Sequence, residues 1–526
     1  MSPRKGLRLA ALAGLVILVV AILGASVGQS RPSMANSANA SVLIDGTTDS
    51  VTNVDPAGNY DYGSATVDVM IYQHLYELKP GGAVTPGLAT SCKSNAALTV
   101  WTCKLRQGIK FSNGDPFTSA DVKWSFDRVL KIKDPSGIYT LITNVAKVTP
   151  NGPNGVTFKL KSPQATWLQI LATGAGMIVD HNTHPADKIV ANTDVANLVG
   201  TGPYVLSKYT PGQSAVFTPN PNYWGPKPKN GGVIINYYAK SSTMKLALQK
   251  GEIDMAFRDF TPTEYASLAK ASGITVHKGA GVNIRYLVLN MKQAPTDKLG
   301  VRQAIAYLMP RQTLASRVYH GLVKPLYSMV PAGLPGHIDA FATRYGRAPS
   351  VAKAKAALQK AGVATPVPLT IWWTPSHYGD ASADEYSEIQ RALNASGLFK
   401  VTLKSAEWAT YSKTLGTQYG AFQLGWFPDY VDAEDYVVPF YAKGNFTSNS
   451  YSNPTMNALL KKEAGAKSTA TRLGYIRQAQ TLAAKDTPVV PYWQGTMIAV
   501  SHKNVQGIDA TLDPSFIMRF WQLSKS

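Results

Sequence analysis

The chain has 526 residues, of which 45% are apolar, so it is long and apolar enough to be globular rather than disordered, with about three compact units. Charged residues make up only 16% of the chain, and the formal net charge is +20. The basic residues are scattered, and no stripe alternates Arg or Lys with aromatic residues as a nucleic-acid groove requires. We therefore expect a diffusely cationic, exported surface and no nucleic-acid partner.

The N-terminus carries a targeting signal. Arg4, Lys5 and Arg8 precede an unbroken run of apolar and small residues over 9–25. This order is typical of a secretory signal, and the run is at the short end of what a membrane-spanning helix needs. We predict that residues 1–25 are a signal peptide or an N-terminal anchor. The membrane is then contacted only through this segment, and only if it stays uncleaved.

The segment that follows bears on how the protein is tethered. Residues 23–26 have the form of a lipoprotein processing site, but Ser26 stands where the lipidated cysteine should be. A hydroxyl cannot form the thioether anchor, so we expect no lipidation there. The exported protein is then either released or held at the membrane surface by its N-terminal segment. Residues 26–40 are rich in Ser, Ala, Asn and Gly, which predicts a flexible linker.

The first elements after the linker are expected to be a strand at 40–43 and a helix over 66–78, where apolar residues recur at helical spacing. The two cysteines, Cys92 and Cys103, come next. An even count in an exported chain favours one disulfide, and two buried free thiols are the alternative. No His or third Cys lies near this pair, which argues against a catalytic or metal-binding role.

Later segments alternate between helical and strand patterns. Thr118 and Asp121 form a capping box ahead of a helical stripe. A strand at 233–238, a helix that ends at Gly251 and a strand at 253–257 predict a βαβ unit. The remaining expected elements are strands at 284–289, 369–373 and 399–403, and helices at 301–308, 350–361, 384–394 and 471–485. This alternation predicts an α/β protein with mixed sheets.

Several short motifs then follow one another over residues 41–515. In chain order they are VDPA at 54–57, NGDPFTSADV at 113–122, GTGPY at 200–204, NPNYWG at 220–225, ALQKGEID at 247–254 and GWFPDY at 425–430. Each motif alone is a weak signal. Their number, order and spacing resemble the extracellular solute-binding proteins of dipeptide- and oligopeptide-type ABC importers, which are bacterial solute-binding protein family 5.

The resemblance implies a two-lobed, periplasmic-binding-protein-like fold with mixed sheets, in which two lobes close on the ligand about a hinge. We place lobe I at 41–285 plus 488–526, with an extra subdomain at 57–196. Lobe II is then 286–487.

The resemblance also implies a function. We expect the substrate-binding component of an ABC importer, a monomer that captures short peptides outside the membrane, in the periplasm or at the outer face, and delivers them to the permease. The same fold binding another solute (an oligosaccharide, an opine-like compound or a metal chelate), or a non-transport receptor or chaperone, is the alternative. No nucleophile, phosphate-loop or zinc motif points to an enzyme, and we expect neither cofactor nor metal.

Asp429 aligns with the carboxylate that grips the peptide α-amino group in the family. Its neighbours Trp426 and Tyr430 are expected to pack against the N-terminal residue of the peptide and to exclude water. Asp432, Glu434 and Asp435 make the same loop acidic, which favours a cationic ligand group. The alternative is a rigid turn in which Asp429 caps a neighbouring segment and the other three carboxylates are solvated.

Further aromatic residues are candidates for the cleft. Trp372 and Trp373 are adjacent on a predicted strand and therefore face opposite sides. One of them, together with Tyr378, is a candidate ligand contact, and core packing of both is the alternative. Tyr62 is a candidate contact from the first lobe.

Overall fold

The computed structural model describes residues 41–375 and 377–526. The predicted signal segment at 1–25 and linker at 26–40 lie outside the described residues. Within the described ranges, no helix combines the length and apolar character that crossing a membrane requires.

The described residues form a mixed α/β structure, as predicted. The strands are β1 (Leu43–Thr47), β2 (Tyr76–Leu78), β3 (Val84–Pro86), β4 (Ala89–Ser94), β5 (Val100–Leu105), β6 (Val145–Pro150), β7 (Gly155–Leu160), β8 (Tyr204–Thr210), β9 (Ser214–Pro219), β10 (Val233–Tyr237), β11 (Met255–Phe257), β12 (Ile274–Leu289), β13 (Val323–Pro325), β14 (Val367–Trp373), β15 (Phe399–Ser405), β16 (Ala421–Trp426), β17 (Val489–His502), β18 (Val505–Gln506) and β19 (Ser524–Lys525). The helices are α1 (Tyr62–Ile71), α2 (Ser119–Ile132), α3 (Trp167–Ile170), α4 (Ser241–Lys250), α5 (Pro262–Leu268), α6 (Leu299–Leu308), α7 (Arg311–Thr313), α8 (Ala340–Tyr345), α9 (Val351–Lys360), α10 (Ala381–Ala395), α11 (Trp408–Tyr411), α12 (Val438–Tyr441), α13 (Pro454–Ala464) and α14 (Thr469–Asp486).

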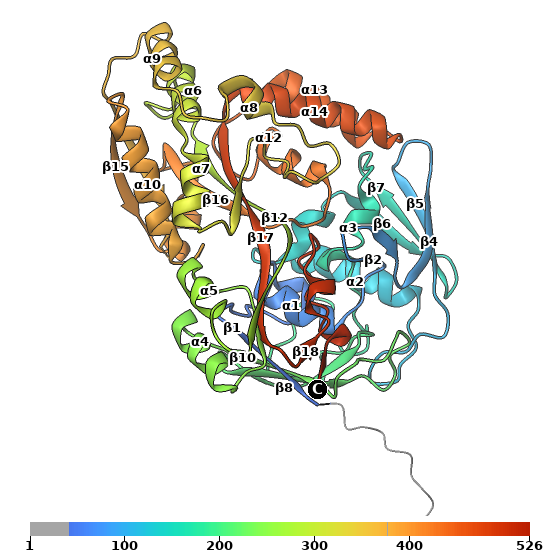
Figure 1. The fold of residues 1–526 in the computed structure, drawn as a ribbon. Coiled ribbons are helices and arrows are strands. Elements are labelled where there is room, and N and C mark those ends of the chain that lie inside the picture. The colour runs from blue at the N-terminus through green and yellow to red at the C-terminus, as the bar shows by residue number, and fades with distance from the viewer. Residues whose placement is uncertain (1–40, 376) are drawn as a thin grey trace, which may run out of the picture. The chain divides into compact units, whose positions relative to one another are not determined.

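One large sheet runs through these elements in the order β15-β14-β16-β12-β17-β11-β1-β10-β9-β8. Its two central strands, β12 and β17, are antiparallel and lie side by side (Figure 1). Their pairing runs from Ile274 opposite His502 to Val288 opposite Val489, with a break in register between Ala280 and Ile284. These two long strands therefore join two groups of strands that otherwise do not pair with each other.

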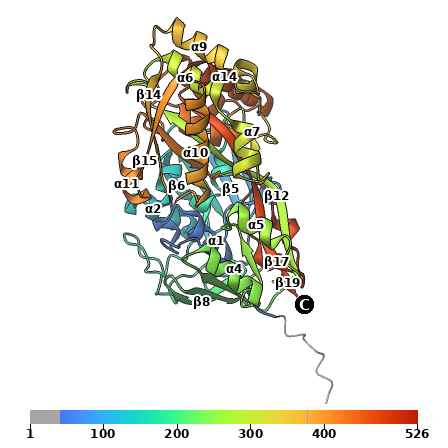
Figure 2. The ribbon, with the colours of Figure 1, turned by 60° about the vertical axis from the view of Figure 1, so that its left-hand side comes forward.

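The two ends of the sheet have separate hydrophobic cores. Beyond β12, residues of β14, β15, α6, α9 and α10 bury one core, and α10 lies along β15 (Figure 2). Beyond β17, helices α4 and α5 cover β11 with a smaller core. The largest core extends from β1 and β10 past β12 and β17 to β16 and α14.

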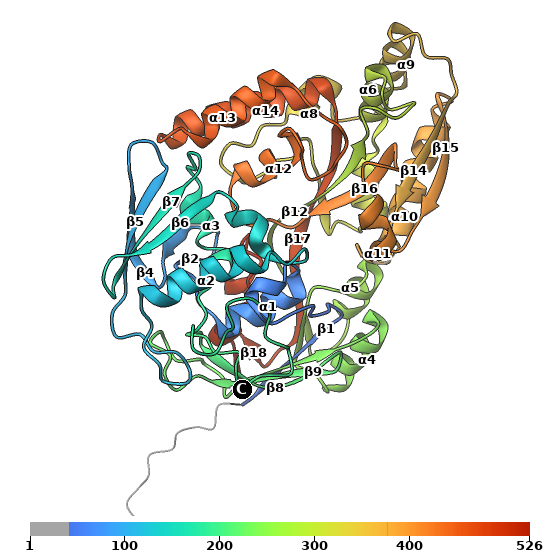
Figure 3. The same cartoon turned by 180° about the vertical axis from the view of Figure 1, so that it is seen from behind.

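A fourth core belongs to a separate four-stranded sheet in the order β4-β5-β7-β6, which lies on the other side of β12 and β17 from α10 (Figure 3). Helix α2 packs on this sheet, with Phe126 and Phe158 ring centroids 4.9 Å apart. The predicted capping box of Thr118 and Asp121 begins α2. Cys92 and Cys103 lie directly opposite each other on β4 and β5 and form the predicted disulfide.

Replacing both cysteines with serine is expected to lower the free energy of unfolding by about 2–3 kcal/mol, because the bridge closes a short loop and restricts the unfolded chain. Chemical unfolding of the variant and the parent under oxidising conditions measures this. An unchanged midpoint would show that the β4–β5 pairing and the core beneath it are sufficient without the bridge.

Local signals located most elements correctly. The βαβ prediction is confirmed: β10, α4 and β11 follow one another, Gly251 ends α4 in the left-handed conformation, and β1 lies between the two strands and parallel to both. The predicted strand at 40–43 was misplaced. β1 begins at Leu43, where its pairing with β10 begins, and its buried Asp45 interrupts the apolar pattern that would have revealed it.

The predicted helix over 66–78 was wrong in extent. Helix α1 starts earlier, after Asp61 caps it, and stops at Ile71, whose carbonyl accepts a hydrogen bond from the Gly202 N–H at 2.7 Å. A Cβ on Gly202 would lie 2.6 Å from that carbonyl, so only glycine allows this approach. The last predicted helical residues instead form β2. A contact from 131 residues away thus marks the end of the helix, and no local pattern predicts it.

Candidate functional site

The loop after β16 contains the predicted ammonium-binding carboxylate. Asp429 Oδ1 accepts a hydrogen bond from the Tyr60 hydroxyl at 2.5 Å, so a residue just before α1 reaches this loop. The backbone N–H of Asp429 donates to Asp435 Oδ2 at 3.0 Å, and Trp426 Nε1 donates to the same oxygen at 2.9 Å. The buried Asp435 therefore fixes both the loop backbone and the indole beside it.

The carboxylates of this loop differ sharply in their partners. Asp432 forms an ion pair with Arg472, which also pairs with Glu463. Among the described residues, by contrast, Asp429 and Asp435 have no ion-pair partner. Asp435 Oδ1 is buried, and no hydrogen-bond partner for it lies in the part of the chain that the structure describes. The loop thus lacks a positive charge where its acids are packed most closely.

The lack of a positive charge beside these carboxylates affects their pKa values. Burial raises the pKa of Asp429 to about 7, against the hydrogen bond from Tyr60. Burial also raises the pKa of Asp435 well above its usual range, and the nearby charge of Asp429 adds to the effect. The pKa of Glu434 is raised as well, first by burial. A cationic group placed here would favour the ionised forms and reverse these shifts.

Stability of the ligand-free protein should report this shift. The folded-state pKa of Asp429 is above its unfolded value, so the folded state binds the proton more tightly and ionisation opposes folding. Raising the pH from about 4 to about 7 should therefore lower the free energy of unfolding of the parent by up to about 1.4 kcal/mol per pH unit. Asp429→Asn should not show this loss, because its side chain does not ionise. Denaturation of both proteins across this range measures it, and parallel curves would contradict the shift.

Trp426 and Tyr430 support the loop. The Trp426 ring lies against Phe440 at 5.1 Å and Phe446 at 5.4 Å between centroids. Tyr430 is buried in the core of the β4–β7 sheet, and its hydroxyl donates to Glu434. Both side chains thus pack the loop that carries Asp429, and a direct contact with ligand stays a prediction for each.

Tyr62 lies at the start of α1 and faces the same loop. Its ring centroid is 6.0 Å from that of Phe427 and 6.1 Å from that of Phe516. The Arg258 guanidinium lies over the Tyr62 ring at 4.0 Å and is paired with Asp49. Tyr62 therefore joins α1 to the Asp429 loop through Phe427, as a first-lobe contact residue would.

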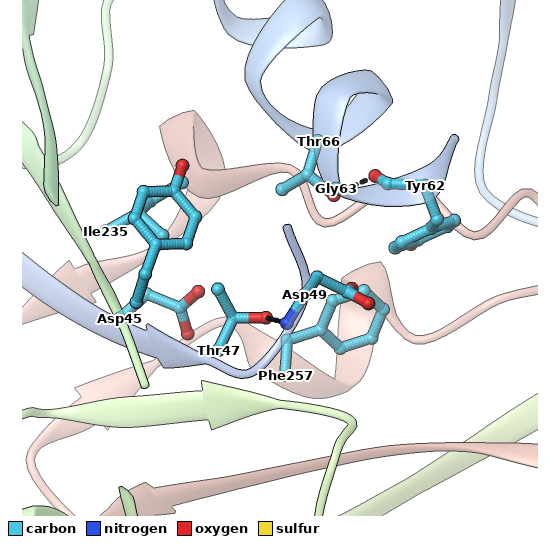
Figure 4. A pocket seen from close by; sticks show the side chains of 9 residues that line it. Asp45, Thr47, Asp49, Tyr62, Gly63, Thr66, Ile235 and Phe257 are labelled. Atoms are coloured by element: carbon cyan, nitrogen blue, oxygen red, sulfur yellow. Dashed lines mark hydrogen bonds between the residues drawn. The ribbon is translucent and has the colours of Figure 1, made fainter. Parts of the chain in front are cut away.

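A small cavity lies next to Tyr62. It is about 10 Å³ in volume and is lined by side chains of β1, α1, β10 and β11 (Figure 4). Asp45 Oδ1 and the Tyr237 hydroxyl, both at this cavity, are buried and find no hydrogen-bond partner within 41–375 and 377–526. The volume is close to the lower limit for a single water molecule, so the cavity cannot hold a peptide.

The other aromatic candidates for the ligand site, Trp372, Trp373 and Tyr378, have different surroundings. Trp372 and Trp373 pack against different cores, on Tyr419 at 4.6 Å and Tyr386 at 6.4 Å between centroids. Neither is brought to Asp429 by these contacts, so core packing accounts for them and a ligand contact stays a prediction. Tyr378 lies instead over the guanidinium of Arg285, 4.0 Å from the ring centroid.

Three functional candidates were missed or underrated. Tyr60 and Phe427 make contacts that link distant segments, which sequence spacing does not report. Arg285 had a visible signal, because it is the only charged residue in the otherwise apolar end of β12 over 284–289. A charge in a buried strand of this kind needs a partner or a function.

The residues His181, His184 and Asp180 have metal-like spacing in the sequence. His184 is buried with its ring beside the Tyr72 hydroxyl, and burial lowers its pKa to about 4. Ligand atoms of Asp121, Asp180 and His181 do lie within 4.8 Å of one another. However, Asp121 closes the capping box of α2 and also contacts His181 Nδ1 at 2.6 Å. Helix capping thus accounts for this cluster.

Comparison with known protein families identifies the family to which the chain belongs. The model described as bacterial extracellular solute-binding proteins, family 5 Middle, matches residues 83–448. The chain belongs to this family. The resemblance inferred from its motifs is therefore confirmed, and so is the expectation of a solute-binding protein that acts outside the cytoplasm.

Two curated relatives illustrate the range of this solute-binding family. The probable D,D-dipeptide-binding periplasmic protein DdpA of Escherichia coli K12 is 28% identical over 481 residues, covering 89% of this chain and 91% of the relative. The glutathione-binding protein GsiB of the same strain is 26% identical over 484 residues, covering 88% and 91%.

Solved structures of solute-binding proteins share the fold. DppA of Helicobacter pylori, in complex with the peptide STSA, superposes with a TM-score of 0.78 at 24% identity, over 92% of this chain and 98% of that one. CtaP of Listeria monocytogenes superposes with a TM-score of 0.81 at 20% identity, over 93% and 99%. These superpositions confirm the predicted two-lobed α/β fold.

Proposed function

We propose that this solute-binding protein captures short peptides and delivers them to the permease of an ABC importer. The observation that carries the proposal is Asp429, a partly buried carboxylate in an acidic loop, whose pKa is raised and which has no ion-pair partner among the described residues. The ammonium of a free peptide supplies the missing charge. Relatives whose names include dipeptide and glutathione binding, and a fold neighbour in complex with a peptide, support the same ligand class.

The ammonium site is built for a charge-assisted hydrogen bond. Asp429 Oδ1 already accepts from Tyr60, and the Asp429 carboxyl has no ion-pair partner among the described residues. Asp435 holds the Asp429 backbone, so the carboxylate is positioned before the ligand arrives. Since hydrogen bonds between ionised groups are about twice as strong as neutral ones, one such contact provides much of the affinity for any peptide sequence.

We also propose that closure occurs about β12 and β17. The pairing of the two strands shifts in register between Ala280 and Ile284 and again between Arg285 and Tyr286, next to the expected lobe boundary at 286. Gly281 lies there, where a Cβ would be 2.7 Å from the Gly495 carbonyl. Small-angle scattering should show compaction when a binding peptide is added, and an unchanged radius of gyration would contradict closure.

The exported protein is proposed to act as a monomer that is not lipidated at Ser26. It would be released, or held near its permease by the N-terminal segment. Intact mass and fractionation of the mature protein in its native host test both points. A lipid-sized mass increase on the N-terminal fragment would contradict the proposal.

A thermal-shift screen tests the ligand class. Random dipeptides and tripeptides with free N-termini should raise the melting temperature, whereas the same peptides acetylated at the N-terminus should not, because acetylation removes the ammonium. Oligosaccharides, opines and metal chelates serve as competing ligand classes. Stabilisation by one of these, with no response to peptides, would contradict the proposed function.

A further inference from the structure

The small cavity beside Tyr62 contains a buried carboxylate without a counter-charge. Asp45 lies on β1, between β10 and β11, and only 2% of the residue is exposed. Among the described residues, its Oδ1 has no hydrogen-bond partner and its carboxylate forms no ion pair. Buried carboxylates are normally paired or bound to a metal ion, because an isolated buried charge is costly. A positively charged occupant of the cavity would remove this cost.

The charges around Asp45 are mainly negative. Burial raises the pKa of Asp45 well above its usual range, and the charges of Asp259 and Asp49 add to the shift. The Arg258 guanidinium is paired with Asp49 and lies 3.8 Å from Asp259 Oδ1, so its charge is already shared by two other carboxylates. Three carboxylates thus share one guanidinium in this part of the described chain. The excess negative charge favours a bound cation.

The side chains that line the cavity offer oxygen atoms. The lining residues with a side-chain oxygen close to the space are Asp45, Thr47, Asp49, Thr66 and Tyr237. Figure 4 shows Asp45 and Thr47 on one side of this space and Thr66 of α1 on the other. The Thr66 hydroxyl donates to the Tyr62 carbonyl at 3.0 Å, and a hydroxyl that donates keeps lone pairs for a second contact. No Lys, Arg, His, Asn or Gln side chain within the described ranges lines the cavity, so its chemistry fits a cation and not an anion.

The size of the cavity restricts the kind of ion. A volume of about 10 Å³ accommodates one water-sized sphere, so an ion would enter without its hydration shell. Mg²⁺ dehydrates reluctantly and usually keeps several waters, and Ca²⁺ takes about 6–8 oxygen ligands. A cavity of this size and lining provides neither. A monovalent cation makes the smaller demand on both charge and ligand number.

We propose that this cavity binds one dehydrated monovalent cation, Na⁺ or K⁺, through Asp45 Oδ1 and the Tyr237 hydroxyl. The site is separate from the proposed ammonium site and does not depend on peptide capture. Tyr62 lines the cavity, and its ring centroid lies 6.0 Å from that of Phe427. A bound ion would therefore stabilise the start of α1 where it faces the loop that carries Asp429.

Thermal unfolding in matched salts tests the site. The purified protein is unfolded in mildly alkaline buffer with NaCl, KCl or choline chloride at equal ionic strength, so that surface charges are screened equally. Choline is too large to enter the cavity. The melting temperature of the parent should be about 2 °C higher in NaCl or KCl than in choline chloride, because an ion that binds only the folded state stabilises it. The difference should saturate as the salt concentration rises.

Three variants locate the ion. Asp45→Asn should lose the difference between the salts, and in choline chloride it should be at least as stable as the parent, because it has no buried charge. Tyr237→Phe removes only a hydroxyl and should shrink the difference. Asp254→Asn is the matched control, because Asp254 is also buried but already pairs with Lys525 at 2.7 Å. It should lower the melting temperature in every salt and keep the response to small cations.

Sodium NMR then measures binding directly. The parent should broaden the sodium signal, and Asp45→Asn should not. Equal melting temperatures of the parent in the three salts would show that the cavity holds water or that Asp45 keeps its proton, and would overturn the site. A cation response that survives in Asp45→Asn would also overturn it, because the ion would then bind elsewhere. If Asp45→Asn does not fold, an undiminished response in Tyr237→Phe is the contradicting result.

Discussion

Replacing Asp429 with asparagine is expected to weaken the binding of a free peptide by about 100-fold or more, or about 3 kcal/mol. Asparagine keeps the shape of the side chain and can still accept the hydrogen bond from Tyr60. It removes only the negative charge, so the peptide ammonium would be desolvated without a counter-charge. Because that charge opposes folding in the absence of ligand, the ligand-free variant should be at least as stable as the parent.

Calorimetry with a peptide that stabilises the parent measures the loss. Asp432→Asn is the matched control, since it makes the same substitution three residues away, where Arg472 already neutralises the charge. It should cost stability but change affinity far less. Equal losses of affinity in the two variants would point to disruption of the loop, and unchanged affinity in Asp429→Asn would remove Asp429 from the ligand contacts.

The second large effect concerns stability. Replacing Asp55 with asparagine is expected to lower the free energy of unfolding by about 3–5 kcal/mol. Asp55 and Arg128 are both buried, with Arg128 Nη1 donating to Asp55 Oδ1 at 2.7 Å and Nη2 donating to Oδ2. Burial alone would raise the pKa of Asp55, but the hydrogen bonds and charge of Arg128 lower it below its usual value. Asparagine would leave Arg128 as an uncompensated buried charge.

Urea unfolding at neutral pH measures this loss. Asp127→Asn is the control on the same helix, since its partner Lys123 and Asp127 itself are both about half exposed, and it should change stability by no more than about 0.5 kcal/mol. Since the folded-state pKa of Asp55 is lowered, the stability it contributes is present at neutral pH and is lost as the pH falls below about 4. A loss under about 1 kcal/mol at neutral pH would show that backbone contacts alone hold Arg128.

The sequence predicted those parts of the fold that local signals determine. Thr118 and Asp121 marked the start of α2, and Gly251 marked the end of α4. The extent of α1 was mispredicted because Gly202, far away in sequence, binds the last helical carbonyl. A long-range backbone contact of this kind does not change the spacing of apolar residues in the helix that it ends, so the sequence pattern does not predict it.

The candidate site was predictable to a similar degree. The motif around Asp429 located the loop, but its partner Tyr60 comes from 369 residues earlier. The fold buries Tyr430 in the core of the β4–β7 sheet, which the identity of an aromatic residue does not predict, and its contact with ligand stays a prediction. Arg285 shows the converse, because one charge in an apolar strand signals a constraint without naming its partner.

The most direct test of peptide capture is the identity of what the protein carries when it is isolated from its native host. Mass spectrometry of small molecules released from the protein purified without refolding should find a mixture of short peptides with free N-termini. The same preparation of Asp429→Asn should lack them. Recovery of a single sugar, opine or metal chelate in their place, at equal amounts from both proteins, would contradict the account.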